Sequence, residues 1–231
     1  AATLSAGGAY TWSRRTGSSV GELRCCTATW GHIHDYPEYR QESWNYPNGY
    51  LTGSGEDVIP QDERNRARFW LVWQAPVQIG RLSVSLLEAY DSGLGYDAVG
   101  SIDPSPYVEN PGYENPPKDL AYFFTKPGVY RTDAITSTNL ALDWAIAVYR
   151  SAEVFVHVQV FNLFNEHGVV VVDTTVETSR NDPDTLTPFN PFHDTPRRGV
   201  NYRYGPNFGH PMSPDDYQVP RTFQLGVGVR F

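Results

Sequence analysis

NLALDWAIAV, residues 139 to 148, places a large apolar side chain at every second position. These positions are Leu140, Leu142, Trp144, Ile146 and Val148. The residues between them are small or polar. Because successive side chains of a β-strand point to opposite faces of a sheet, this period of two predicts a strand with one bulky apolar face and one small or polar face.

Five further segments alternate in the same way. They are residues 66–74, 81–90, 154–165, 222–231 and, more weakly, 7–13. The chain has 18 prolines and none falls in these six segments, which fits strands because proline cannot donate a hydrogen bond to a ladder. We therefore expect an all-β protein with about six antiparallel strands.

The connections between these segments alternate in length. Those at 74–81 and 148–154 are short, whereas those at about 15–63, 92–136 and 166–219 are long and rich in Pro, Gly, Asn, Asp and Tyr. Long loops without regular structure are uncommon in compact soluble domains, but outer-membrane barrels combine short periplasmic turns with long extracellular loops. The pattern thus predicts a portion of an antiparallel transmembrane β-barrel, with its bulky face toward lipid and its small or polar face toward the lumen.

Composition narrows the classes of protein further. The formal charge is −8 without any basic run, which argues against nucleic acid as a partner. No stretch approaches the roughly 18 apolar residues of a membrane-spanning helix, whereas strands of about 9 to 11 residues suit a barrel. Six strands are fewer than the ~8 of the smallest common barrels, so we expect a portion of a larger one.

Two parts of the sequence carry a family resemblance. FNLFNE (161–166), followed by a long loop and by PRTFQLGVGVRF (220–231), resembles the C-terminal end of TonB-dependent outer-membrane receptors. DVIPQDERNRARFWLVWQAP (57–76) and LLEAYDSGLGYDAVGSIDPSPY (86–107) resemble late strands and loops of the large receptors with a carboxypeptidase-regulatory-like N-terminal domain. The resemblance implies that residues 1–231 are the C-terminal part of a plugged barrel of about 22 strands, with the plug and earlier strands absent from this chain.

The function implied by this resemblance is import across the bacterial outer membrane. Such a receptor takes up a scarce ligand, of which siderophores, cobalamin, oligosaccharides and peptides are all compatible with the sequence. Its energy comes from TonB, which contacts the missing plug. The expected partners are therefore outer-membrane lipid, TonB, a small-molecule ligand and the barrel-assembly machinery.

The resemblance also implies roles for particular residues. In the family, the barrel-assembly machinery recognises the last strand, and Gln224, Gly226, Val229 and Phe231 match the spacing of that assembly signal. Aromatic residues in the long connections are candidates for ligand contact. They are Trp44, Tyr46, Tyr107 and Tyr202. The same residues could instead pack loop against loop or form an aromatic girdle.

Three short motifs do not favour catalysis or metal binding. GSSVG (17–21) has the Gly-x-Ser-x-Gly spacing but no helical pattern after it, as a nucleophile elbow requires. GHIHD (31–35) has His32 and His34 beside Asp35, but a metal site would need a further ligand, which His193 or His210 could supply only if the loops fold together. Cys25 and Cys26 are adjacent, and whether they form a disulfide is left open. We expect no enzyme activity, no metal and no cofactor.

Two alternatives remain open at this stage. The first is a soluble all-β ligand-binding module, which would bury its bulky face in a dry core. The second is a mature small porin that starts at Ala1, which would need further strands in LAYFFTK (120–126) and GVVVVDTTV (168–176).

Overall fold

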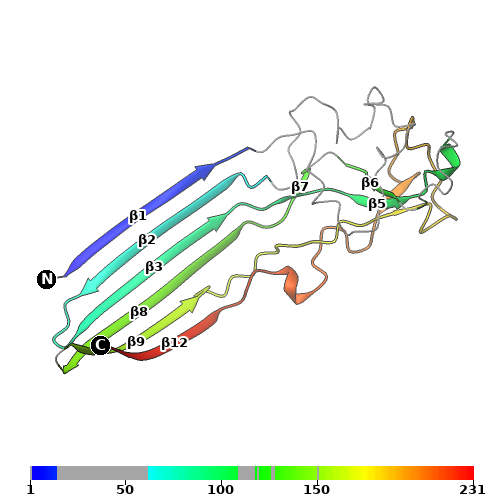
Figure 1. Cartoon of the computed structure of the whole chain (residues 1–231). Helices are drawn as coiled ribbons and strands as arrows, with labels where there is room; N and C mark the ends of the chain where they lie inside the picture. The colour runs from blue at the N-terminus through cyan, green and yellow to red at the C-terminus, as the bar shows by residue number, and fades with distance from the viewer. Residues whose placement is uncertain (1, 15–61, 109–117, 119, 126–127, 150) are drawn as a thin grey trace.

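The computed structural model describes residues 2–14, 62–108, 118, 120–125, 128–149 and 151–231. Within these residues, six long strands form one antiparallel sheet in the order β1-β2-β3-β8-β9-β12 (Figure 1). The strands are β1 (Thr3–Trp12), β2 (Asn65–Ala75), β3 (Arg81–Asp91), β8 (Ile135–Tyr149), β9 (Ala152–Phe161) and β12 (Thr222–Arg230). They correspond to the six predicted segments, so the prediction of an all-β antiparallel protein is confirmed.

The end of β9 differs from the prediction. The alternation suggested a strand as far as Asn165, but β9 ends at Phe161. Asn162 and Asn165 have φ angles of 49° and 56°, in the left-handed region that asparagine tolerates better than most residues. The Asn162 side chain holds this turn, since its Oδ1 accepts the Glu166 amide and its Nδ2 donates to the carbonyls of Glu166 and Val219.

The short connections lie together at one end of the sheet. Residues 76–80 join β2 to β3, and two residues join β8 to β9. Gly80 has a φ of 80°, and a Cβ there would lie 2.4 Å from the Ala145 carbonyl oxygen, so glycine suits this tight turn. β1 begins and β12 ends at this same end, and the long connections leave from the other (Figure 1).

Where the structure describes them, the long connections 92–134 and 166–219 contain short strands outside the six alternating segments. Their short strands form three two-stranded sheets: β4 with β7, β5 with β6, and β10 with β11. The strands are β4 (Gly95–Tyr96), β5 (Val99–Ile102), β6 (Leu120–Phe123), β7 (Tyr130–Arg131), β10 (Val176–Thr178) and β11 (Tyr202–Tyr204). Two 3-10 turns, η3 (Ser105–Tyr107) and η4 (Pro214–Asp216), complete these connections.

Both connections contribute to one hydrophobic core, and we refer to them together as the loop body. The core residues are Ala98, Ile102, Tyr122, Phe124, Val176, Phe189, Phe192 and Tyr202. The ring of Phe124 from the first connection lies 4.5 Å, between centroids, from that of Tyr202 in the second. The loop body is therefore a packed unit at the far end of the sheet.

The two segments that a small porin would need do not join the large sheet. Within 120–126, the strand β6 pairs with β5 in the loop body. Residues 168–176 make only isolated bridges, Val169 with Tyr217, Asp173 with Phe208 and Thr175 with Val99, before β10 begins. In the part of the chain that the structure describes, the large sheet thus has six strands.

Candidate functional site

The bulky side chains of the six strands come together on one face of the sheet, the apolar face. The pairing register aligns Leu142 with Val158 of β9, and Val158 with Leu225 of β12. The same row continues through Val84 and Trp73 to Leu4. Because side chains that pair across strands share a face, the large residues of all six strands form one continuous surface.

This surface is open in the described structure. Even on inner strands, Phe69, Trp73 and Leu142 keep 46%, 42% and 37% of their surface exposed, and Leu225 on β12 keeps 70%. Single apolar residues are common on protein surfaces, but a continuous apolar surface over six strands is not. Patches of that size mark sites of contact with a membrane or another protein. No described helix is long and apolar enough to cross a membrane.

The apolar face is slanted with respect to the hydrogen-bonded rows. On β12, the large residue of this face nearest the loop body is Phe223. Pairing across the strands connects Phe223 to Ala6 of β1 through Val160, Leu140, Leu86 and Leu71. On β1, however, the face continues six positions beyond Ala6, to Trp12.

The size of this shift gives an angle. Six residues of strand span about 20 Å, and five spacings between strands span about 24 Å. Their ratio corresponds to an angle of about 40° between the strands and the line perpendicular to the edge of the apolar face. Strands of outer-membrane barrels are tilted by roughly 35–45° from the barrel axis. An apolar face whose edge runs parallel to a bilayer would therefore shift from strand to strand in this way.

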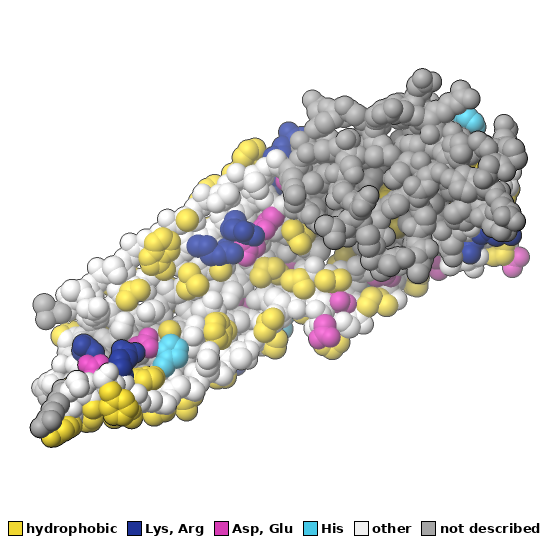
Figure 2. Space-filling view, viewed as in Figure 1, with side chains coloured by type: hydrophobic (Ala, Val, Ile, Leu, Met, Phe, Trp, Pro, Cys, Tyr) yellow, Lys and Arg dark blue, Asp and Glu magenta, His cyan; other side chains and the backbone are white. Residues whose placement is uncertain are grey.

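The opposite face, which we call the polar face, has small and charged side chains together with a few large apolar ones, among them Trp70, Leu87 and Phe155. Arg81 donates to both carboxylate oxygens of Glu153, at 2.6 and 2.7 Å, and His157 Nδ1 lies 2.5 Å from Asp143 Oδ1. Nearer the loop body, Arg68 Nη2 lies 2.7 Å from Asp91 Oδ2. Charged groups are visible in two clusters over this face in Figure 2.

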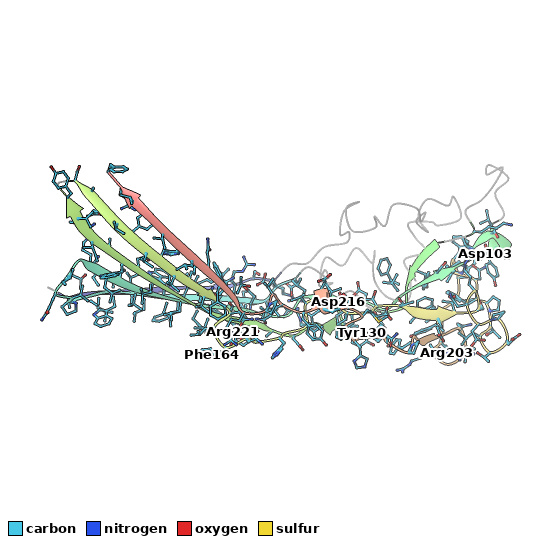
Figure 3. The ribbon with its side chains drawn as sticks, turned by 90° about the horizontal axis from the view of Figure 1, so that it is seen from below. Asp103, Tyr130, Phe164, Arg203, Asp216 and Arg221 are labelled. Carbon is cyan, nitrogen blue, oxygen red and sulfur yellow. The ribbon has the colours of Figure 1, made fainter. Side chains whose placement is uncertain are left out.

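The polar face is hollowed near the short connections. A depression of about 700 Å³ is lined by residues of β2, β3, β8, β9 and β12, including Arg81, Asp143, Phe155, His157 and Arg230. The sheet curves, with β8, β9 and β12 rising out of the plane of β1 to β3 (Figure 3). The ion pairs of this face thus border a water-accessible depression.

The loop body carries an aromatic cluster made of Tyr96, Tyr130, Tyr204 and Phe208. The rings of Tyr204 and Phe208 stack with their centroids 4.2 Å apart. The guanidinium carbon of Arg198 lies 4.0 Å from the centroid of the Tyr204 ring. The hydroxyls of Tyr130 and Tyr204 are hydrogen-bonded. Burial, followed by that hydrogen bond, raises the pKa of Tyr130 above its ordinary value, so this phenol stays neutral.

The candidate ligand-contact residues fall in different places. Tyr202 is 8% exposed and lies in the core of the loop body, so its position favours the packing role over ligand contact. Tyr107 is half-buried against that core, and burial raises its pKa. Trp44 and Tyr46 lie outside the described residues, as do the motifs at 17–21, 25–26 and 31–35.

The four residues of the expected assembly signal lie on or next to β12. Gln224 and Gly226 are on the polar face, whereas Val229 is on the apolar face. Phe231 follows the strand and is 93% exposed. Among the described residues, no three His, Cys, Asp or Glu side chains gather in a way that would hold a metal ion.

The described structure defines the chain as an antiparallel all-β protein with one exposed apolar face and a folded loop body. No family model, curated protein or solved structure matches it.

One residue of interest was not singled out from the sequence. Arg221 lies two positions before Phe223, just beyond the limit of the apolar face, and its guanidinium lies 5.8 Å from the centroid of the Phe223 ring. The sequence signal that could have identified it is an arginine two positions outside the last large apolar residue of an alternating strand, where it shares the face of the apolar residues. Arg14 holds the equivalent position two residues after Trp12 on β1.

Proposed function

We propose that this chain forms part of the wall of a β-barrel in the bacterial outer membrane, as the C-terminal part of a receptor of the TonB-dependent type. The observation that carries this proposal is the exposed apolar face, whose slant of about 40° corresponds to strands tilted through a bilayer. The apolar face would contact lipid, the polar face would line the lumen, and the loop body would lie outside the cell.

The proposed activity is uptake of a scarce ligand, such as a siderophore, cobalamin, an oligosaccharide or a peptide. The sequence resemblance at 161–166 and 220–231 supports this activity. A packed loop body fits a receptor, because a folded surface can present a fixed set of side chains to a ligand. Energy from TonB would reach the barrel through a plug encoded before residue 1.

The alternative of a soluble ligand-binding module has less support. A soluble sandwich buries its bulky face against a second sheet. Here the bulky face includes Phe69, Trp73 and Leu142, each more than a third exposed. Burying such residues typically contributes about 1.5–3 kcal/mol each, so leaving a whole face in water would be costly.

A flotation assay tests the membrane part of the proposal. The full-length receptor, refolded from urea in the presence of phosphatidylcholine vesicles, should float with them in a density gradient and resist extraction by high salt, because the complete barrel leaves no strand edge unpaired in the bilayer. A monomer that stays soluble without detergent or lipid would contradict it. For the receptor part, the gene upstream of the Ala1 codon should encode a plug; a signal peptide directly before Ala1 would instead support the porin.

The assembly signal gives a cellular test. In the full-length receptor, Phe231→Ser should lower the amount of protein in the outer membrane, because it removes the terminal aromatic residue of the signal. The amount is measured by blotting the outer-membrane fraction, with Thr222→Ser on the same strand as the control. Wild-type levels of the Phe231 variant would show that the signal has been misassigned.

A further inference from the structure

Arg221 lies where the apolar face ends beside the loop body. The next residue of β12 on the same face is Phe223, which is 69% exposed. In the row one step beyond that of Phe223, β8, two strands away from β12, has Thr138, and β3, three strands away, has Glu88. Arg221 is thus the cation at this border on the β12 side of the sheet.

Several contacts fix the position of this arginine. Its backbone amide donates to Asn165 Oδ1 at 2.9 Å, and its Nη1 donates to the Leu163 carbonyl at 3.3 Å. Its guanidinium packs against the Phe223 ring. Residues 162–166 are themselves held by the hydrogen bonds of Asn162, and Arg221 lies beside Phe164 of this turn (Figure 3).

The surroundings of Arg221 are apolar rather than acidic. Phe164, adjacent to the Leu163 carbonyl, is 69% exposed, and Val219 is 74% exposed. One guanidinium nitrogen donates to Leu163, and no ion pair joins this side chain to a described carboxylate. A guanidinium with donors to spare, bordered by exposed apolar groups, complements a ligand with an anionic head and apolar chains.

We propose that Arg221 binds the headgroup phosphate of an anionic membrane lipid, whose acyl chains lie along the apolar face beside Phe223 and Phe164. This inference rests on the proposed membrane location. A planar guanidinium can donate two parallel hydrogen bonds to one phosphate, and basic residues at a membrane border attract anionic lipids. The site would help to set the depth of β12 in the bilayer.

Lipid retention measures this site directly. The full-length receptor is refolded into phosphatidylcholine vesicles that contain a minor fraction of phosphatidylglycerol, and it is then extracted in mild detergent. Native mass spectrometry gives the ratio of the two lipids that stay bound. We expect preferential retention of phosphatidylglycerol by the wild type and a ratio about fivefold lower for Arg221→Gln. Arg221→Lys should keep part of the preference, because it retains the charge but not the planar fork.

Arg230→Gln is the matched control. Arg230 also lies over an aromatic ring, that of Phe155 at 5.6 Å, but on the polar face and at the other end of the sheet. Its replacement should leave the lipid ratio unchanged. Circular dichroism establishes that each variant has the β-sheet content of the wild type.

Each outcome decides between defined alternatives. Equal lipid ratios for the wild type and Arg221→Gln, with both proteins in the vesicle fraction, would overturn the lipid site alone. Displacement of phosphatidylglycerol by millimolar inorganic phosphate would identify a site for free phosphate and would also overturn it. Failure of the wild type to enter vesicles would contradict the proposed function and, with it, this inference.

Discussion

The carboxylate of Asp62 is fully buried where the loop body meets β2. Arg131 of β7 donates to Asp62 Oδ2, to the Asp62 carbonyl and to the Gly93 carbonyl, each at 2.8 Å, and Arg64 also pairs with this carboxylate. Arg131 therefore connects three segments that are distant in sequence. No periodicity reveals such a contact, because it depends on two loops that meet only in the folded chain.

Removing this arginine should weaken the attachment of the loop body. Arg131→Gln removes one of the guanidinium groups that the described structure places on Asp62, and loss of a partner to a buried charge typically costs about 2 kcal/mol. Urea unfolding in detergent micelles should show a lower midpoint with an unchanged slope. Arg197→Gln, an exposed arginine of the loop body, is the control and should unfold like the wild type. If the urea midpoint of Arg131→Gln equals those of Arg197→Gln and the wild type, Arg131 does not stabilise the fold.

Asp182 gives the loop body a defined response to acid. The Thr185 hydroxyl donates to this carboxylate at 2.5 Å, and Arg203 Nη2 lies 2.6 Å away. Both the hydrogen bond and the nearby guanidinium lower the pKa of Asp182 below its ordinary value. The ionised form is therefore favoured in the folded state, so its contribution is present above the ordinary pKa and is lost as the pH falls through the lowered value.

The lowered pKa of Asp182 should appear in the pH dependence of unfolding. Asp182→Asn should reduce the loss of stability on acidification in that pH range, because the variant has no carboxylate to protonate there. Urea midpoints measured from neutral to acidic pH would test it, with Asp184→Asn as the neighbouring control. If the wild type and Asp182→Asn lose stability in parallel, the carboxylate is not responsible.

At the scale of elements, β9 and β12 show what the sequence could predict. Their alternation gave both strands and the face of each residue, because a bulky, exposed apolar face leaves a clear period of two. It did not give the end of β9, since Leu163 and Phe164 continue the apolar composition while the asparagines turn the backbone. The strands of the loop body have only two to four residues, too few for a period to be recognised.

The two glycines of β12 differ in their surroundings, and this difference gives a paired test. A Cβ on Gly228 would lie 2.5 Å from the Phe155 ring, whereas one on Gly226 would meet His157 Cβ at an ordinary 3.7 Å. Gly228→Ala should therefore destabilise the sheet by about 1 kcal/mol, since the ring has to move. Gly226→Ala should be neutral or slightly stabilising, because alanine restricts the unfolded chain.

Urea midpoints of the two alanine variants, measured side by side in micelles, provide the comparison. The expected order is Gly226→Ala at or above the wild type and Gly228→Ala below it. The reverse order would mean that the Phe155 ring does not pack over Gly228 in the folded protein.

At the scale of the whole molecule, the chain has a polar face, an apolar face and a folded loop body at one end. The sequence predicted the first two from alternation, and the alternating connection lengths predicted that the long loops share one end. It could not predict that two of those loops share a core, because residues such as Tyr122 and Phe189 acquire partners only through tertiary packing. The slant of the apolar face also required the strand register, which single strands do not contain.

The proposed function requires that one face of the sheet contacts lipid while the other contacts water. Single cysteines at neighbouring positions of β8 test it most directly, in a background in which Cys25 and Cys26 are replaced by serine. Leu142 lies on the apolar face and Ala141 on the polar face. In vesicles, a water-soluble maleimide should label Ala141→Cys and leave Leu142→Cys unlabelled until detergent is added. Equal labelling of both cysteines in intact vesicles, or labelling of Leu142→Cys alone, would show that the apolar face does not contact lipid.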